Sequence, residues 1–442
     1  MRPNIPLVSL TGVGNGRNRR TLSLGRRTGI HILVCDTTRC RRPPMRLPRE
    51  CYQMQKTIET HLPHLSQAQM TGLALWVCGA ILAGSACQNA VASALSPWRK
   101  WNNLRQYLRE WLYDGSDRTS PCQTQLDVTL CFAPLLRWVL AWWYSERLAL
   151  AIDPTLKGDQ TTAIVISVLY RSCAIPVAWH IRHADQPGSW MDPTVELLQA
   201  LAPAVPENMT VIVLCDRGIA SPKLWQQIRD QGWHPGMRYR KNITFGADGG
   251  KRLPAQRFVS RPDTAWIGRG TAFNTPKAQR RCTLLVVWYS EQEEPWIILT
   301  DLAPDQVGPS WYALRFWIEL GFKAIKSLGW KWDKTRRTDP TRVSRHWLVL
   351  SVATLLALAY GTRVEDAQER RIAPGNLRAP PKALAPNHRD PWSRPARTVS
   401  VIRHGIDWLR RLLIKGRLWS RVWLLPEPWP EPKLNLEITR HV

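Results

Sequence analysis

The sequence predicts an α/β fold, in which a mixed sheet flanked by helices carries a β-rich insertion and follows a helical N-terminal unit. Three observations carry this prediction. Apolar residues recur at helical spacing through residues 51–140. From Leu148 onward, β-branched runs end at turn-like breaks and then alternate with amphipathic segments, as in a mixed α/β layer. From about 236 to 305 the helical spacing is lost, and short strands follow one another between Gly, Pro and Asp turns.

The charge of the chain indicates the kind of partner. The 442 residues include 61 Lys and Arg against 34 Asp and Glu, which gives a net charge of +27. So large a positive charge favours a polyanion, most simply nucleic acid. The 24 tryptophans add only weak support, because indole rings fill protein cores as readily as they stack on bases.

Cysteine usage and the apolar segments predict a cytoplasmic protein without a membrane span. The ten cysteines are scattered, with no CxxC pair and no zinc-finger spacing, which is typical of reduced thiols. Residues 70–87 are apolar but diluted by Gly, Ser and Thr, and the run 347–361 is too short to cross a bilayer. The first segment is expected to belong to a buried helical bundle, with a membrane span as the alternative, and the second is expected to be a buried core helix.

The flanking regions are basic. Residues 1–50 contain eleven Arg and two acidic residues, and they are expected to form a disordered basic arm, with Met45 and Met54 as alternative starts. The helical unit 51–140 contains the basic amphipathic stretch "LRQYLREWL" and is expected to bind DNA, a plain helical bundle being the alternative. Residues 363–442 have a net charge of +8 and many prolines, and they include an amphipathic basic helix at 405–423.

Two aspartates follow apolar strands of the predicted sheet. "LALAID" ends on Asp153 and "MTVIVLCD" ends on Asp216, and each precedes a break. If the strands are neighbours, the carboxylates converge at the sheet edge, where open α/β sheets bind ligands. Carboxylates this close repel each other, so the pair shares a proton or holds a cation, and oxygen-only ligands suit Mg²⁺. The alternative is that each aspartate only caps the turn that follows it.

A helix predicted over residues 311–330, "WYALRFWIELGFKAIKSLGW", carries a narrow polar stripe. At about 100° per residue, its polar side chains fall within an arc of about 60°. They are Tyr312, Arg315, Glu319 and Lys326. The apolar residues fall on the opposite side, so the helix is amphipathic. Most such stripes are solvated faces with salt-bridging pairs, but a phenol, a guanidinium, a carboxylate and an ammonium can also hold a metal ion and phosphates together.

The spacing Tyr312-x2-Arg315-x3-Glu319-x6-Lys326 resembles the Y-(2)-R-(3)-E-(6)-K signature of bacterial insertion-sequence transposases of the IS-four-like DDE group. Three further features of the sequence agree with this resemblance. Asp153 in "AIDPT" resembles the first family Asp, Asp216 in "VLCDRG" resembles the second, and Glu319 resembles the third carboxylate. The 102 residues between Asp216 and Glu319 resemble the β-rich insertion of the group. The resemblance covers about 140–362, and it implies an RNase H-like catalytic domain at 141–362 with its insertion at about 236–305.

The resemblance implies a DNA transposase that cleaves and transfers strands at the terminal inverted repeats of an insertion sequence. Asp153, Asp216 and Glu319 would be catalytic and would bind two Mg²⁺ ions, for which Mn²⁺ can substitute. The implied partners are the transposon ends, the target DNA and a second copy of the chain in a synaptic complex. A bacterial cytoplasm, in association with the nucleoid, is the implied location, and no membrane partner is expected.

The resemblance also implies which side chains contact DNA. Arg315 and Lys326 would hold phosphates of the transposon end, and Tyr312 would hydrogen-bond to a phosphate near the cut. Members with such an insertion are associated with a hairpin intermediate, in which a flipped base stacks on a tryptophan. Trp266 and Trp288 are candidates for that role, and ordinary packing in a β core is the alternative for both.

Two other functions remain open at this stage. Another RNase H-like nuclease, such as a resolvase, would share the acidic site but has no reason to carry the Tyr-Arg-Glu-Lys stripe. A decayed or domesticated transposase would bind DNA without catalysis, although all three carboxylates are present. The transposase hypothesis makes a geometric prediction, because Glu319 must lie within shared-metal reach of both aspartates despite the long insertion.

Overall fold

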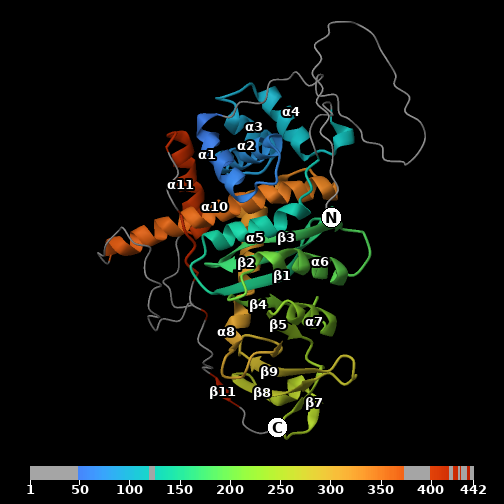
Figure 1. Ribbon diagram of the computed structural model, residues 1–442. Helices are drawn as coiled ribbons and strands as arrows, with labels where there is room; N and C mark the ends of the chain where they lie inside the picture. The colour runs from blue at the N-terminus through green and yellow to red at the C-terminus, as the bar shows by residue number, and fades with distance from the viewer. Residues whose placement is uncertain are drawn as a thin grey trace, which may run out of the picture. The chain divides into compact units, whose positions relative to one another are not determined.

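The structure is a computed structural model that describes residues 48–118, 125–372, 399–417, 422–426, 429 and 436–438 (Figure 1). All of these residues belong to one compact unit, Arg42–Val442. The basic arm predicted for residues 1–50 lies outside the described residues, except for its last three positions. Much of the C-terminal region predicted for 363–442 also lies outside them, but its amphipathic helix is described.

Helices make up the described part of the chain before the sheet, as the spacing in residues 51–140 predicts. They are α1 (Arg49–His61), α2 (Gln67–Ala83), α3 (Gln88–Leu95), α4 (Trp101–Leu112) and α5 (Phe132–Ala141), with 3-10 turns at Gly115–Asp117 and Thr129–Cys131. A capping box begins α2, because the side chains of Ser66 and Gln69 each accept a hydrogen bond from the other residue's backbone N–H. Residues 70–81 of α2 are all buried, so this apolar stretch is a core helix, as predicted.

One mixed sheet follows, in the order β3-β2-β1-β4-β5-β10-β9-β8-β6-β7. Its strands are β1 (Arg147–Lys157), β2 (Thr161–Tyr170), β3 (Cys173–His183), β4 (Thr210–Cys215), β5 (His234–Tyr239), β6 (Thr244–Ala247), β7 (Arg252–Pro254), β8 (Thr264–Ala272), β9 (Arg280–Trp288) and β10 (Trp296–Thr300). β1, β2 and β3 are antiparallel neighbours, whereas β4 is parallel to β1 and β5 is parallel to β4. This is the strand order of an RNase H-like sheet, and the predicted α/β class is confirmed.

The β-rich insertion continues the same sheet. Its predicted start, at about 236, falls inside β5, which is a core strand because it pairs with β4 in parallel. The added strands are β6 to β10, and β10 joins them to the core by pairing antiparallel with β5. Because β5 and β10 share one hydrogen-bonded ladder, the insertion is anchored directly beside the strand that follows Asp216.

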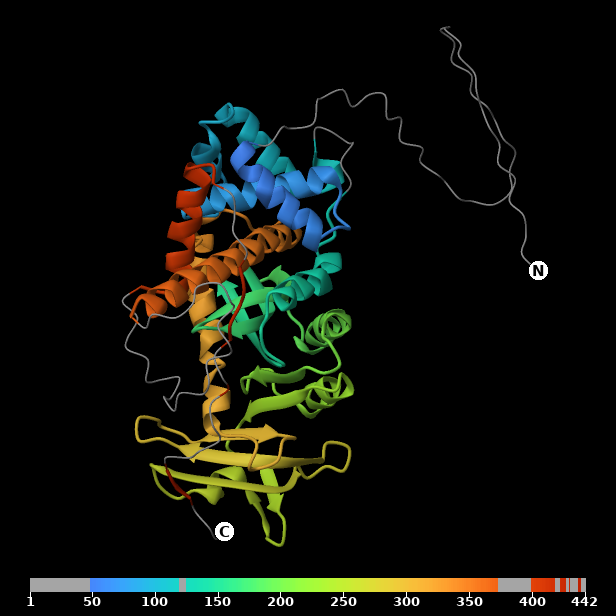
Figure 2. The ribbon, with the colours of Figure 1, turned by 60° about the vertical axis from the view of Figure 1, so that its left-hand side comes forward.

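Helices cover both faces of the core strands (Figure 2). The helices after β1 are α6 (Met191–Leu201), α7 (Pro222–Asp230), α8 (Pro309–Ala313), α9 (Phe316–Lys323), α10 (Pro340–Ile372) and α11 (Val401–Ile414), of which α11 packs on α10 rather than on the sheet, with 3-10 turns at Ala202–Ala204, Ala255–Phe258 and Trp332–Lys334. α6 and α7 lie on one side of the sheet, and the α8–α9 column lies on the other. α9 contacts β1, β2 and β3, and α8 contacts β5. The α8–α9 column therefore crosses the core strands on the face that carries Asp153.

The longest helix, α10, is a core helix. It has 33 residues, so the prediction that the apolar run 347–361 is too short to cross a bilayer underestimated its length. By length and composition alone, residues 340–367 could cross a membrane, but 89% of their apolar window is buried inside the protein. α10 packs against α2, β3 and α11. The helical layer and the sheet therefore share this helix as part of one core.

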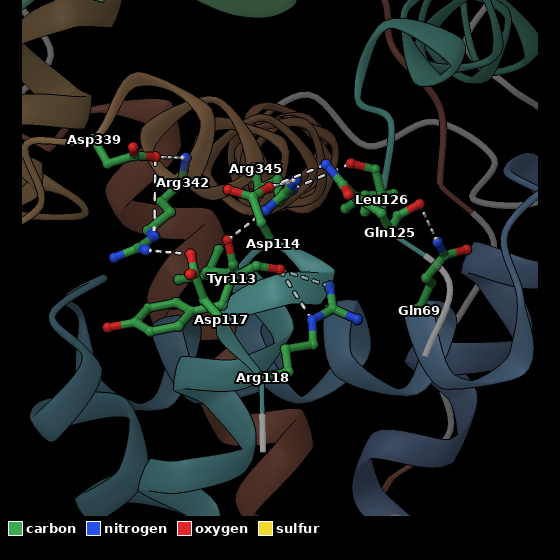
Figure 3. Close-up of polar contacts among 11 residues, drawn as sticks. Gln69, Tyr113, Asp114, Asp117, Arg118, Gln125, Leu126, Asp339, Arg342 and Arg345 are labelled. Carbon is green, nitrogen blue, oxygen red and sulfur yellow. Dashed lines mark hydrogen bonds and ion pairs between the residues drawn. The ribbon is translucent and has the colours of Figure 1, made fainter. Parts of the chain in front are cut away.

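A buried polar network fixes the start of α10 to the helical layer (Figure 3). Arg345 is only 1% exposed, and its guanidinium donates to the Leu112 and Leu126 carbonyls and to Asp114 Oδ1, the last at 2.6 Å. One turn earlier, Arg342 donates to Asp117 at 2.8 Å. Since Asp114 and Asp117 follow α4 directly, the end of α4 and the start of α10 are held together by charge-assisted bonds.

Described parts of the C-terminal tail return to the sheet. Leu424 donates its N–H to the Trp142 carbonyl at 2.6 Å, just before β1. Trp429 packs edge-on against Trp311, with ring centroids 4.8 Å apart. Finally, β11 (Glu437–Ile438) pairs in parallel with β8 of the insertion. The tail thus contacts both the core strands and the insertion.

Candidate active site

The two aspartates lie on neighbouring parallel strands. β1 pairs with β4 as far as Ile152 and Cys215, so Asp153 and Asp216 each come directly after the last pair. The strand end predicted at Asp153 is wrong, because β1 continues to Lys157. Beyond Ile152, β1 keeps only β2 as a strand partner, and Pro154 is tolerated there because prolines are accommodated on strand edges. The convergence of the two aspartates does not depend on that break.

The helix predicted over 311–330 is three pieces rather than one. α8 ends at Ala313, α9 spans Phe316–Lys323, and Ala324–Leu328 winds as a π-helix. The π-turn adds a residue to the winding, so angles calculated at the α-helical period fail after position 324. Leu328, which that arithmetic places on the apolar side, is 63% exposed. Arg315 occupies the tight connection between α8 and α9.

Arg315 lies between two of the three carboxylates. Its Nη1 donates to Asp153 Oδ2 at 3.3 Å, and its Nη2 donates to Glu319 Oε1 at 2.7 Å. The side chains are exposed to very different extents, with Arg315 at 5%, Asp153 at 16% and Glu319 at 50%. One guanidinium therefore joins the first and third carboxylates across the length of the insertion. This places Glu319 beside Asp153, while the predicted shared reach of Glu319 to Asp216 as well stays a prediction.

Asp216 is held by a separate set of donors. Tyr312 donates its hydroxyl to Asp216 Oδ1 at 3.2 Å, and the Arg217 backbone N–H donates to the same oxygen at 2.8 Å. Arg238 Nη1 lies 3.7 Å from that oxygen. No local pattern in the sequence marks Arg238 as part of the site. Because Cys215 pairs with Met237, recognition of β5 as a core strand would have placed Arg238 next to Asp216.

Burial and the neighbouring charges shift the pKa values of the side chains at this site. Burial raises the pKa of Asp153 to about 6, and the charges of Glu319 and Asp216 add to the rise while Arg315 opposes it. Burial alone would lower the pKa of Arg315, but Tyr312 and the three carboxylates together raise it above its ordinary value. Burial also raises the pKa of Tyr312, so its hydroxyl keeps its proton and serves as a donor.

The remaining predicted residues lie apart from this cluster. Among the described residues, Lys326 forms no ion pair with any of the three carboxylates. Burial lowers the pKa of Lys326, and the carboxylate whose charge opposes this effect is Asp333. Trp266 packs against Phe258, with ring centroids 4.3 Å apart. Trp288 donates its indole N–H to the Gln292 carbonyl at 2.9 Å. Both tryptophans therefore have packing or hydrogen-bonding roles within the insertion.

The donor set suits a hard divalent cation, although a guanidinium now lies among the donors. In the described residues, no group of three or more His, Cys, Asp or Glu is arranged to hold a metal ion. The chemistry still fits Mg²⁺, because Asp153, Asp216 and Glu319 offer only oxygen ligands and mutual repulsion helps to raise the pKa of Asp153. A cation bound by all three carboxylates would neutralise the negative charge that the Arg315 guanidinium neutralises in this structure.

Part of the chain resembles a known family of domains. Residues 191–356 match the family described as "Transposase DDE domain". The match supports a DDE transposase. It includes Asp216 and the whole Tyr-Arg-Glu-Lys segment, whereas Asp153 lies before its first residue. The match does not test the IS-four-like subgroup, which was predicted from the spacing of Tyr312, Arg315, Glu319 and Lys326 and stays a prediction.

Two further comparisons were made for this transposase-like chain. No curated protein matches it significantly. Among solved structures, a cryo-EM structure of a piggyBac transposase synaptic complex with hairpin DNA matches with a TM-score of 0.42 and 10% identity, over 84% of this chain and 77% of that chain. At that score the likeness carries no argument about this chain.

Proposed function

We propose that this protein is a DNA transposase that cleaves and joins strands at the terminal inverted repeats of an insertion sequence, in a Mg²⁺-dependent reaction. The observation that supports the proposal is the pair of bonds from Arg315 to Asp153 and Glu319 and the bond from Tyr312 to Asp216, in a chain of which residues 191–356 match the transposase DDE domain. Asp153 on β1, Asp216 directly after β4 and Glu319 on α9 would together form a site for metal-assisted displacement at phosphorus.

In this proposal the carboxylates hold the metal. Asp153, Asp216 and Glu319 would bind two Mg²⁺ ions, which supply charge stabilisation to the attacking and leaving oxygens when bound. The chain's own residues do the remaining work. Arg315, with two donors already directed at carboxylates, would turn its fork toward a DNA phosphate, and Lys326 would add a point charge. Tyr312 keeps Asp216 oriented through its hydroxyl.

The substrates and assembly belong to the same proposal. The chain would bind the transposon ends and target DNA in the bacterial cytoplasm, and two copies would hold two ends in one complex. The net charge of +27 supports DNA binding, because cations that neutralise phosphates release condensed counterions.

The direct test is a cleavage assay with the purified full chain. Incubation with Mg²⁺ and a duplex bearing the element's terminal inverted repeats should yield strand cleavage at the repeat ends. Glu319→Gln should abolish cleavage while DNA binding remains, because the substitution removes a metal ligand and leaves the basic surface unchanged. A wild-type protein that binds the repeats but never cleaves them would favour the non-catalytic alternative.

A second readout guards against an indirect effect of the substitution. Mn²⁺ titration of the DNA-free protein, followed by calorimetry, should show binding that Glu319→Gln weakens. Glu59→Gln is the matched control, because Glu59 is an exposed carboxylate on α1 that pairs with Lys56 rather than with any residue of the site. Equal loss of Mn²⁺ binding in both variants would argue against the assigned ligands.

A further inference from the structure

A basic segment of the chain connects α9, the helix that carries Glu319, to the helical layer. We define the basic segment as residues 323–337, which run from the end of α9 to the loop before α10. Its exposed cations outnumber its one exposed carboxylate, Asp333. They are Lys323, Lys331, Lys334 and Arg336. Such an excess on one short segment favours an anionic partner.

The basic segment is joined to α3 and α4 by specific bonds. The Ala86 N–H donates to the Trp330 carbonyl at 2.6 Å, which docks the turn before α3 on the segment. Gln88 then links both sides, because its Oε1 accepts from Arg337 Nη2 at 3.0 Å and its Nε2 donates to the Arg105 carbonyl at 2.8 Å. The segment and α4 are therefore adjoining parts of one surface.

The same surface is tied to the strand that carries Asp153. Lys157, four residues further along β1, is 5% exposed and donates to the Arg337 carbonyl at 2.8 Å. Burial lowers the pKa of Lys157 to about 8, and the positive charge of Arg337 adds to the effect. The positive charges of Lys157 and Arg337 repel each other, so a polyanion bound at this surface would reduce that repulsion.

The exposed face of α4 has the side chains that read base edges. Asn102, Arg105 and Arg109 have a spacing of three and then four residues, which places them on one face, and all three are exposed. Arginine and asparagine are the residues that recognise guanine and adenine in the major groove. Glu110, the one acidic residue of α4, is buried, so this face carries no carboxylate.

We infer that α4 enters the major groove of a DNA duplex while the basic segment holds phosphates of the same duplex, next to the carboxylates. The inference rests on the proposed function, and it adds which elements bind the transposon end. In this arrangement α4 supplies sequence recognition, and the cations of the segment supply position and affinity. The hydrogen bonds through Gln88 and Arg337 hold α4 and the basic segment in a fixed position relative to each other.

The test separates the two contributions by binding measurements without metal, so that no cleavage is required. The full chain is titrated with a duplex that carries the terminal repeat and with a scrambled duplex of equal length, over a range of salt concentrations. Asn102→Ala should weaken binding to the repeat by roughly 5- to 100-fold and leave the scrambled duplex unchanged. Lys334→Ala and Arg336→Ala should weaken both and reduce the salt slope by about 1 each.

Lys56→Ala is the matched control, because Lys56 is an exposed cation on α1 that pairs with Glu59. It should change neither measurement. The inference is overturned if Asn102→Ala leaves the repeat preference intact, or if it changes the oligomeric state instead, since that result makes the α4 face a protein interface. Loss of preference in a protein that never cleaves DNA would support this inference and contradict the proposed function. If the wild type cleaves DNA and Asn102→Ala keeps its preference for the repeat, the proposed function is supported and this inference is contradicted.

Discussion

Arg315 and Asp153 form a largely buried ion pair, with 3.3 Å between Nη1 and Oδ2, although 162 positions separate them in the chain. The pair connects the turn after α8 to the middle of β1, across the whole insertion. Because the same guanidinium also bonds Glu319, the binding of a cation between these carboxylates and the presence of Arg315 there exclude each other.

We therefore expect Arg315→Gln to bind Mn²⁺ more tightly than the wild type does in the absence of DNA. The substitution removes the cation that competes for Asp153 and Glu319. Cleavage should nevertheless fall by at least about 100-fold, as when a positioned donor is removed from an active site. Calorimetric titration with Mn²⁺ and a cleavage assay measure the two effects.

Lys323→Gln controls for the loss of one positive charge near Glu319, because Lys323 is exposed on α9 and outside the ion pair. Its Mn²⁺ affinity should remain close to that of the wild type. An equal gain in both variants would mean that general electrostatics, rather than direct competition, governs metal binding.

Tyr312→Phe should alter the metal requirement rather than DNA affinity. The substitution removes the hydroxyl that donates to Asp216 at 3.2 Å and leaves the buried ring in place. Loss of a hydrogen bond to a ligand carboxylate costs about tenfold in metal affinity or more. The Mg²⁺ concentration for half-maximal cleavage should rise accordingly. A large loss of DNA affinity at constant Mg²⁺ dependence would instead assign the hydroxyl to a phosphate.

Gly321→Ala should loosen α9 from the sheet. A Cβ at this position would lie 2.8 Å from the Ala174 Cβ of β3, closer than real side chains approach. Overpacking of this kind costs about 1–3 kcal/mol, and it would displace Glu319 two residues away. Thermal melting and cleavage should both decline, with DNA binding retained. The double variant Gly321→Ala with Ala174→Gly should recover part of both, which an unrelated defect would not do.

His346 should make the protein less stable in mild acid. The imidazole is fully buried, and burial lowers its pKa well below 6.5. The unfolded chain therefore gains a proton below about pH 6.5 that the folded chain does not, and stability falls as the pH decreases, by up to about 1.4 kcal/mol per pH unit. Urea unfolding at pH 7.5, 6.5 and 5.5 should show this fall reduced in His346→Phe. Parallel curves for the two proteins would contradict the prediction.

The sequence predicted the site best where it depends on regular geometry. β1 and β4 are parallel neighbours, and their pairing ends at Ile152 and Cys215, so the next residues, Asp153 and Asp216, lie at the same edge of that pairing. Tyr312, Arg315 and Glu319 precede the π-turn, so helical arithmetic still holds for them approximately. Lys326 lies within that turn, where the α-helical period no longer holds, so the same arithmetic does not place it.

Other features depend on contacts that no local pattern contains. Arg238 approaches Asp216 only because β5 belongs to the core sheet. The insertion was predicted to begin at about 236, which assigned Arg238 to the insertion instead of to a core strand. The bridge from Arg315 to Asp153 depends on how the chain returns after the insertion. A break was predicted directly after Asp153, yet β1 continues along β2 as far as Lys157, and its Pro154 is accommodated on the strand edge.

The return of the tail to the sheet has a consequence for how the protein is made. Leu424 bonds beside the start of β1, and Glu437–Ile438 complete an edge of β8. These residues leave the ribosome long after the strands that they cover. A nascent chain therefore emerges with those edges open, and open strand edges invite pairing with other chains. Translation that stops before residue 424 should consequently yield a product prone to aggregate, even though every proposed catalytic residue has already been synthesised.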